Sequence, residues 1–169
     1  RVDGPINEEQ ERSLKKVTTS AKHLLKLINE VLDISRVESR ELQLEIKELD
    51  LKWLVESVLP SFEPLIKHKG LALTMNIDQS LPRVYGDEKR IKQILINLLS
   101  NAVKFTHKGG ITISAKLSEW CIQPREQPLF AEICVEDTGI GIKEEDISRV
   151  FDKFVQVDTS MRRRYEGTG

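Results

Sequence analysis

The chain has 169 residues, 39% of them hydrophobic and 31% charged, as in an ordinary soluble globular protein with enough apolar side chains for a core. Its formal net charge of −1 excludes an overall basic field, so we expect no nucleic-acid partner. No apolar run approaches the roughly 20 residues that span a bilayer, and no signal peptide opens the sequence. We therefore expect no membrane contact by this stretch of chain.

Cysteines and histidines are few and scattered. Cys121 and Cys134 have neither a metal-ligand spacing nor a disulfide framework around them, which is typical of reduced cysteines in a cytosolic protein. The three histidines, His23, His68 and His107, are far apart in the sequence and do not suggest a zinc site.

The first third of the sequence predicts one long helix over residues 8–37. Apolar residues follow the alternating three- and four-residue spacing of a helical seam at Leu14, Val17, Ala21, Leu24, Ile28 and Val31. Leu25 and Leu32 make this stripe broader than the seam of a two-stranded coiled coil. A single helix cannot bury such a stripe, so the helix is expected to join a bundle or a dimer.

The rest of the chain predicts an α+β domain, a sheet with helices on one face. Alternation marks the strands. Pro60 and Pro64 interrupt or kink the helix predicted over 51–68, and Asp87 is placed to cap the helix predicted over 88–105. The segment "LPRVYGD" is interpreted as a loop, and a polar connection spans 119–128. The predicted elements in chain order are strand 42–49, helix 51–68, strand 71–77, helix 88–105, strands 109–117 and 129–137, and helix 144–154.

The helix at 88–105 carries one polar stripe on an otherwise apolar surface. At 100° per residue a narrow sector holds Arg90, Gln93, Asn97, Asn101 and Lys104. We expect the helix to be packed into the domain around most of its circumference, with the stripe lining a pocket or groove. Carboxamide oxygens can coordinate Mg²⁺, and a lysine one turn on suits phosphate. The alternative is a satisfied polar network against a neighbouring strand.

A second motif is "VEDTGIGI", residues 135–142. A predicted strand delivers Asp137, and Gly139 and Gly141 then permit close approaches that a Cβ would prevent. The glycine pattern is shorter than the dinucleotide fingerprint, and the acidic residue precedes it. An ionised carboxylate only accepts hydrogen bonds, so Asp137 fits a ligand donor such as an exocyclic amine. An ordinary turn is the alternative.

The third motif is "VFDKFVQVDTSMRRRYEGTG", at the end of the chain. Phe151 and Phe154, three residues apart, are interpreted mainly as core residues. The run 162–164 is usually a solvated basic patch. Next to "GTG" it can instead supply charge and backbone N–H groups to a polyphosphate.

Together these stretches resemble the catalytic and ATP-binding domain of sensor histidine kinases, within the superfamily that includes DNA gyrase ATPases. "NLLSNAVKFT" is similar to the N box, "EDTGIGI" to the first glycine box, "VFDKFVQ" to the F box and "GTG" to the opening of the second glycine box. "HLLKLINEVLDISRVES" resembles the second helix of the dimerisation and phosphotransfer domain. The resemblance implies a partial dimerisation domain at 1–41 and, at 42–169, an α/β sandwich of the histidine-kinase ATPase type that lacks its C-terminal part.

The resemblance also implies ATP and Mg²⁺ as cofactors. Asn101 would coordinate the Mg²⁺ that bridges the phosphates, Asn97 would assist one turn earlier, and Lys104 would approach the phosphates. Gyrase-like ATPases place a glutamate where this chain has Asn97, which favours a kinase over a hydrolase. Asp137 would accept from the adenine amine, and its motif's glycines would let the nucleotide come close.

The lid of the site is implied by the same resemblance. Phe154 in the F box would close over the nucleotide, and Gly167 and Gly169 would wrap the phosphates. Arg163 is taken as the lid cation, although the resemblance does not single out one arginine of the run 162–164. Glu166 stands where the family usually has a further glycine.

The implied reaction is transfer of the ATP γ-phosphoryl group to a histidine, followed by relay to a response-regulator aspartate. His23 is followed by "LLKLIN" and not by the acidic residue, arginine and proline of an H box. We therefore expect the acceptor on a dimerisation helix absent from this chain, and no autophosphorylation by this stretch alone. The resemblance also implies a homodimer through the helix at 8–37. It implies a cytoplasmic location, either as a free protein or as the cytoplasmic part of a membrane-anchored sensor.

Two other function classes remain open at this stage. One is a degenerate regulatory module that binds nucleotide or a partner without phosphotransfer. The other is a structural dimer scaffold built on the apolar seam of the first helix.

Overall fold

A computed structural model describes residues 4, 6–118 and 130–152, which form two compact units, 44–147 and the remainder. The predicted connection at 119–128 and Cys121 lie outside the described residues, as do the candidate residues beyond 152. None of the helices described is both long and apolar enough to cross a lipid bilayer.

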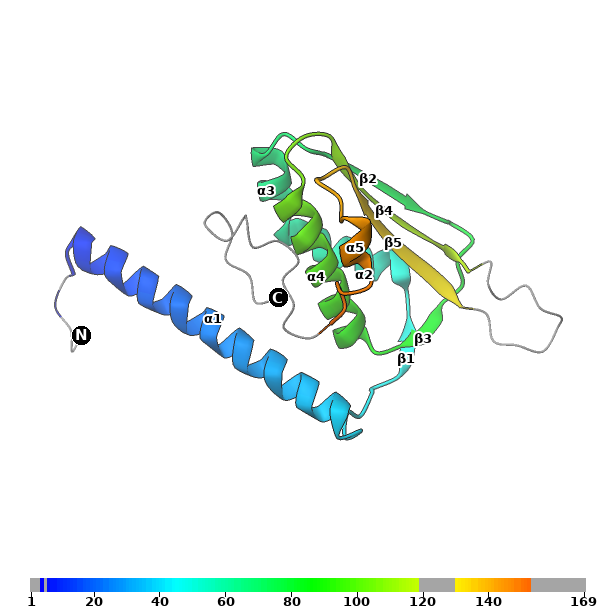
Figure 1. Ribbon diagram of the computed structural model, residues 1–169, viewed down its shortest axis with the longest axis horizontal. Coiled ribbons are helices and arrows are strands. Elements are labelled where there is room, and N and C mark those ends of the chain that lie inside the picture. Colours follow the sequence, from blue (N-terminus) through cyan, green and yellow to red (C-terminus); the bar gives the residue numbers. More distant parts are fainter. Residues whose placement is uncertain (1–3, 5, 119–129, 153–169) are drawn as a thin grey trace. The chain divides into compact units, whose positions relative to one another are not determined.

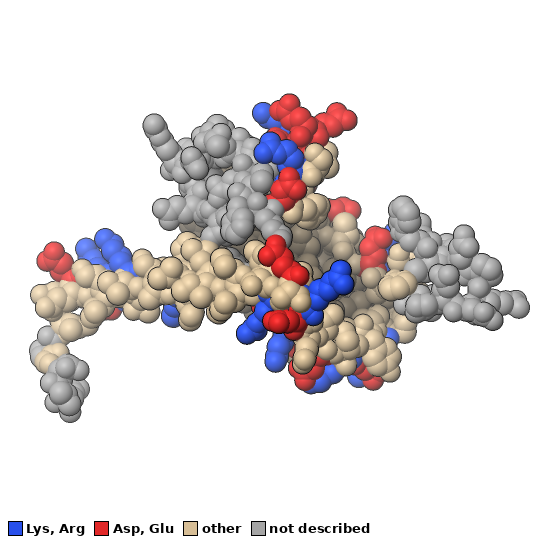
Figure 2. Space-filling model, turned by 60° about the horizontal axis from the view of Figure 1, so that its bottom comes forward, with Lys and Arg blue, Asp and Glu red and all other residues tan. Residues whose placement is uncertain are grey.

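Helix α1 (Glu8–Glu38) confirms the long N-terminal helix. It begins at a capping box in which Asn7 and Gln10 each accept from the other's backbone N–H, at 2.8 and 2.9 Å. It ends with Arg40 in the left-handed region, at φ 58°. Figure 2 shows a band of uncharged side chains along this helix. The seam residues are largely exposed within their unit, from 47% at Ile28 to 65% at Val17, so the stripe still requires a partner.

The second unit is built on a mixed three-stranded sheet, which confirms the α+β class (Figure 1). Its strands are β2 (Ala72–Ile77), β4 (Gly110–Leu117) and β5 (Ala131–Asp137), in the order β2-β4-β5. The β2 and β4 strands are parallel, whereas β4 and β5 are antiparallel, with Ile111 opposite Asp137.

Helices cover one face of this sheet (Figure 1). They are α2 (Leu51–Val58), α3 (Glu63–His68) and α4 (Glu88–Phe105), with a 3₁₀ turn η1 (Leu59–Ser61) between the first two. The helix predicted over 51–68 is interrupted at Pro60 and Pro64, as expected, because proline cannot donate the hydrogen bonds of a continuous helix. Helix α4 confirms the predicted bounds and the predicted cap.

The core lies between the helices and the sheet. Alternate residues of β4 point into it, so Ile111, Ile113 and Ala115 are all 1% exposed or less. Ile111 and Ile113 pack in one hydrophobic cluster with residues of the helices, which include Leu54, Val55, Val58, Ile66, Leu95, Leu99, Ala102 and Val103.

Strands β1 (Lys47–Leu49) and β3 (Val84–Gly86) form a small antiparallel ribbon, which shows that two predictions from the sequence were wrong. In this ribbon Leu49 lies opposite Val84. The predicted strand at 42–49 was too long, because a strand extends only as far as its partner backbone. The segment "LPRVYGD", interpreted as a loop, contains that partner. Helix α5 (Glu144–Ile147) is shorter than predicted, since residues 148–151 form turns.

Asp87 joins this ribbon region to α4. Its Oδ1 accepts from the backbone N–H of Arg90 at 3.1 Å, and its Oδ2 accepts from that of Glu45 at 2.9 Å. The first bond caps α4, and the second fixes the chain that leads into β1. The hydrogen bonds from Glu45 and Arg90 lower the pKa of Asp87 below its ordinary value, because they favour the charged carboxylate.

Replacing Asp87 by Asn should change how stability depends on pH. A carboxyl group whose pKa is lowered by folding stabilises the protein above its unfolded pKa, and this contribution is lost as the pH falls through the folded value. Asp87→Asn should therefore be less stable than the wild type at neutral pH, and the difference should narrow below about pH 4. Urea unfolding at several pH values measures the free energy of unfolding of the wild type and of Asp87→Asn. A difference between the two that stays constant down to acidic pH would contradict the assigned hydrogen bonds.

Candidate functional site

The predicted asparagines lie on the exposed side of α4. Asn97 and Asn101 are exposed, one turn apart, and Lys104 is half-buried a turn further on. Among the described residues neither of these amides has a hydrogen-bonding partner, whereas at the start of the stripe Arg90 Nη1 donates to Gln93 Oε1 at 2.9 Å. The polar-network interpretation therefore holds for Arg90 and Gln93 but not for the asparagines. The described residues also contain no group of three or more His, Cys, Asp or Glu side chains that could hold a metal ion. The oxygen donors that the stripe offers to a cation are amides.

The exposed side of α4 is wider than the sequence predicted. Ile94 is 57% exposed, Ile96 42% and Leu98 43%, so the expectation of a helix packed around most of its circumference is wrong. The buried residues of α4 are Leu95, Leu99, Ala102 and Val103. The reason is the two-layer architecture, in which the sheet and α2 cover one side of α4 within residues 44–147.

Asp137 is held at the end of β5 by two hydrogen bonds. Its Oδ1 accepts from the backbone N–H of Gly139 at 2.8 Å and from the hydroxyl of Thr106 at 3.3 Å. Thr106 is the C-cap residue of α4 and is completely buried. No described residue donates to Oδ2, which leaves one oxygen of this exposed carboxylate open to a ligand donor.

Thr106 is a residue that the sequence analysis missed. A threonine directly after a predicted helix is a recognisable signal, since such hydroxyls often bond to neighbouring groups. Its partner, Asp137, lies 31 residues further along the chain, so periodicity could not pair the two. Thr106 links the helix that bears the asparagines to the strand that bears the carboxylate.

The glycine motif packs closely against the end of α4. A Cβ on Gly139 would lie 2.7 Å from the Phe105 carbonyl oxygen and 2.6 Å from Asp137 Oδ1. Thr138 Oγ1 donates to the Lys108 carbonyl and accepts from the Gly110 N–H, both at 3.0 Å. The motif is therefore more than an exposed turn, because it ties β5 to the segment between α4 and β4.

Gly141 has a different requirement. Its φ is 69°, in the left-handed region, but a Cβ there would meet no atom within 4 Å. Gly141 is needed for backbone conformation, whereas Gly139 is needed for space.

The remaining candidate residues come from the end of the sequence, and most of them cannot be placed relative to this surface. Phe154, Arg163, Gly167 and Gly169 lie outside the described residues. Phe151 is described and is 93% exposed, so its interpretation as a core residue is wrong.

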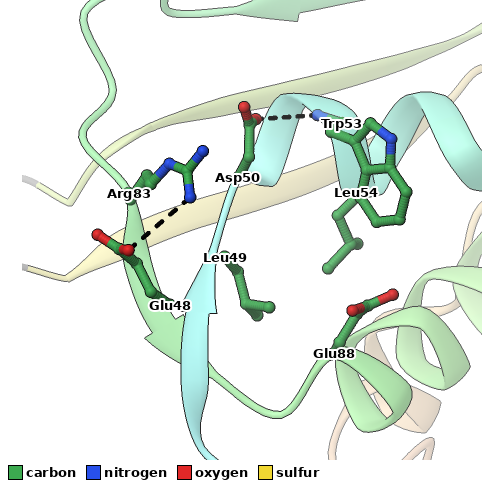
Figure 3. A pocket seen from close by; sticks show the side chains of 7 residues that line it. All are labelled: Glu48, Leu49, Asp50, Trp53, Leu54, Arg83 and Glu88. Atoms are coloured by element: carbon green, nitrogen blue, oxygen red, sulfur yellow. Dashed lines mark hydrogen bonds and ion pairs between the residues drawn. The ribbon is translucent and has the colours of Figure 1, made fainter.

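A cavity of about 320 Å³ lies elsewhere, between the β1–β3 ribbon and the first turns of α2 and α4 (Figure 3). In it, Arg83 pairs with Glu48 at 3.8 Å, and Asp50 accepts from the backbone N–H of Trp53 at 3.0 Å. None of the predicted site residues lines it. Asn97, Asn101 and Asp137 are all exposed, and none of them lines this cavity.

Comparison with known proteins shows which family part of this chain is similar to. Residues 86–169 match the family described as histidine kinase-, DNA gyrase B- and HSP90-like ATPases. The chain is 39% identical, over 98% of its length, to the autoinducer 2 sensor kinase/phosphatase LuxQ of Vibrio cholerae. It spans 19% of the length of that relative.

Solved structures agree with the sequence comparison. Full-length ShkA in complex with AMPPNP is similar with a TM-score of 0.77 and 30% identity, over 90% of this chain and 31% of that one. Histidine kinase ThkA in complex with the response regulator protein TrrA is similar with a TM-score of 0.60 and 26% identity, over 92% of this chain and 42% of that one.

Replacing Gly139 by Ala should push the glycine motif away from the end of α4. The added methyl group has no space, so we expect a loss of about 1–3 kcal/mol in the free energy of unfolding. Amide chemical shifts of Phe105 and Asp137 should move in the same variant. Gly141→Ala is the control, because it should cost about 1–2 kcal/mol through its backbone alone and leave those two shifts in place. Unchanged shifts in Gly139→Ala would refute the close contact.

Proposed function

This chain belongs to the family of histidine kinase-, DNA gyrase B- and HSP90-like ATPases, and we propose that the surface between α4 and the end of β5 binds ATP with Mg²⁺. The observation that carries this proposal is the bond from Thr106 to Asp137. Through it, a carboxylate with one open oxygen is fixed next to the helix that presents two asparagines without described partners.

The base end of the site is formed by Asp137. Its open Oδ2 accepts a hydrogen bond from the exocyclic amine of adenine, while Oδ1 stays engaged by Thr106 and Gly139. Gly139 and Gly141 keep Cβ atoms away from the approaching nucleotide. A carboxylate held by protein donors is already oriented before the ligand arrives, which reduces the entropic cost of binding.

The phosphate end is formed by α4. The Asn101 amide oxygen would hold Mg²⁺, with Asn97 assisting, because carboxamide oxygens are suitable ligands for this hard cation. When bound, the ion neutralises charge on the phosphates. Lys104 is the nearby cation, and its Nζ lies 4.9 Å from the centre of the Phe105 ring, which holds the side chain at the helix end.

The lid in this proposal consists of Phe154, Arg163, Gly167 and Gly169. Their roles rest on the motif resemblance, with Arg163 as the lid cation. The two glycines bring backbone N–H groups to the phosphates.

The reaction we propose is a protein-histidine kinase reaction. An imidazole nitrogen of a histidine on a dimerisation helix absent from this chain forms a bond to the γ-phosphorus, the bond to the bridging oxygen breaks, and ADP leaves. The phosphoryl group then passes to an aspartate of a response regulator. The relative's designation as a sensor kinase and the ThkA–TrrA complex support this assignment. Asn97, which carries no carboxylate to activate water, favours transfer over hydrolysis.

The exposed seam of α1 supports a homodimer through this helix, in a cytoplasmic kinase or in the cytoplasmic part of a membrane-anchored sensor. The second candidate function is a degenerate module that binds nucleotide without transferring phosphate. It is favoured by the same described surface, since binding requires the asparagines and Asp137 but no acceptor.

Replacing Asn101 by Ala should abolish the effect of Mg²⁺ on nucleotide binding. The variant loses the amide oxygen that ligates the ion, so affinity for ADP should fall by about tenfold or more with Mg²⁺ and change little without it. Calorimetric titration with ADP, with and without Mg²⁺, measures this. The matched control is Asn76→Ala, which removes an exposed asparagine from β2 and should bind as the wild type does. Equal Mg²⁺ dependence in Asn101→Ala and wild type would refute the metal assignment.

Labelling with γ-³²P ATP separates the kinase from the degenerate module. A longer protein that contains this chain and its acceptor helix should gain acid-labile phosphohistidine, and Asn101→Ala should remove it. The present chain, with His23, His68 and His107, should gain none. Nucleotide binding without any labelling of the longer protein would favour the degenerate module.

A further inference from the structure

Lys69 occupies a fixed position between α3 and β2. Its backbone N–H donates to the Leu65 carbonyl at 3.0 Å, and Gly70 follows in the left-handed region with φ 65°. The N–H of Leu71 then returns to the Ile66 carbonyl at 3.1 Å. These bonds close the end of α3 and direct the Lys69 side chain from a rigid backbone.

The Lys69 ammonium reaches across to the end of α4. Its Nζ donates to the carbonyl oxygens of Val103, Lys104 and Thr106, the last two at 3.2 Å. An ammonium has three donors, and all three are used here. The last carbonyls of a helix lack partners within the helix and carry the negative end of its dipole, so a half-buried cation is well placed among them.

The same three carbonyls belong to the backbone of the proposed site. Thr106 also donates its hydroxyl to Asp137, Lys104 carries the candidate phosphate cation, and the next carbonyl, that of Phe105, lies against Gly139. We infer that Lys69 is a positioning residue, which holds the end of α4 so that Thr106 keeps Asp137 oriented toward the base. This inference rests on the proposed function and extends it to a residue outside the family motifs identified in the sequence.

A residue that only closes a helix would give a different result from one that positions Asp137. Loss of a cap lowers stability and leaves the choice between bases unchanged. Loss of positioning changes that choice, because Asp137 accepts from the adenine amine, whereas hypoxanthine places a carbonyl oxygen there. The affinity ratio of ADP to IDP therefore reports on Asp137 orientation.

The experiment titrates the chain with ADP and with IDP, for the wild type, Lys69→Met, Lys69→Arg and Lys67→Met, at a temperature where circular dichroism shows each variant folded. Lys67→Met is the matched control, because it removes an exposed lysine from the last turn of α3, two residues before Lys69. The wild type should prefer ADP, and the preference should fall by about tenfold in Lys69→Met. Lys69→Arg keeps the charge but not the geometry and should show an intermediate preference. Lys67→Met should match the wild type.

A double variant tests whether Lys69 acts on Asp137 through Thr106. In Thr106→Val the hydroxyl to Asp137 is absent, so adding Lys69→Met should change the ADP to IDP ratio little further. An unaltered ratio in the folded Lys69 variants, or an equal change in Lys67→Met, would overturn the inference. If Lys69→Met does not fold, Lys69→Arg alone decides between these outcomes. Failure of the wild type to bind ADP or to prefer it would instead refute the proposed function.

Discussion

The burial of one side of α4 is the constraint on which the candidate site depends. Leu95, Leu99 and Val103 are almost completely buried, and burial of each such side chain contributes about 1.5–3 kcal/mol. Because Leu99 is two residues from both asparagines, it lies about 200° around the helix from each of them. Packing Leu99 into the core therefore directs Asn97 and Asn101 outward. Their exposure is a consequence of the core.

Contacts at the end of α4 hold Asp137 next to the helix that bears these asparagines. Helices leave their last carbonyls unpaired, and here Lys69 donates to those of Val103 and Lys104, while Gly139 packs against that of Phe105. Thr106 continues the same contact into β5 through Asp137. Strand β5 is placed by its antiparallel pairing with β4, and the hydrogen bond from Thr106 holds its last carboxylate, Asp137, against the end of α4.

The predictions from sequence succeeded where the signal was local. The bounds of α4 and its cap, Asp87, depend on neighbouring residues and were confirmed. The pairing of β1 with β3 was missed, because three-residue strands have no periodicity and depend on a distant partner. The exposure of Ile94 and Leu98 was also missed, since hydropathy does not report how many layers cover a helix. Thr106 and Lys69 required tertiary contacts that no spacing encodes.

The two ends of the proposed site differ in how far the protein itself completes them. At the base end Asp137 already has two protein donors, so its orientation exists without ligand. At the phosphate end Asn97 and Asn101 have no partner among the described residues, and on the proposed function a Mg²⁺ ion would supply one. On the proposed function, base selectivity is therefore a property of the folded chain, whereas phosphate binding depends on the ion. Substitutions at the two ends should accordingly separate selectivity from Mg²⁺ dependence.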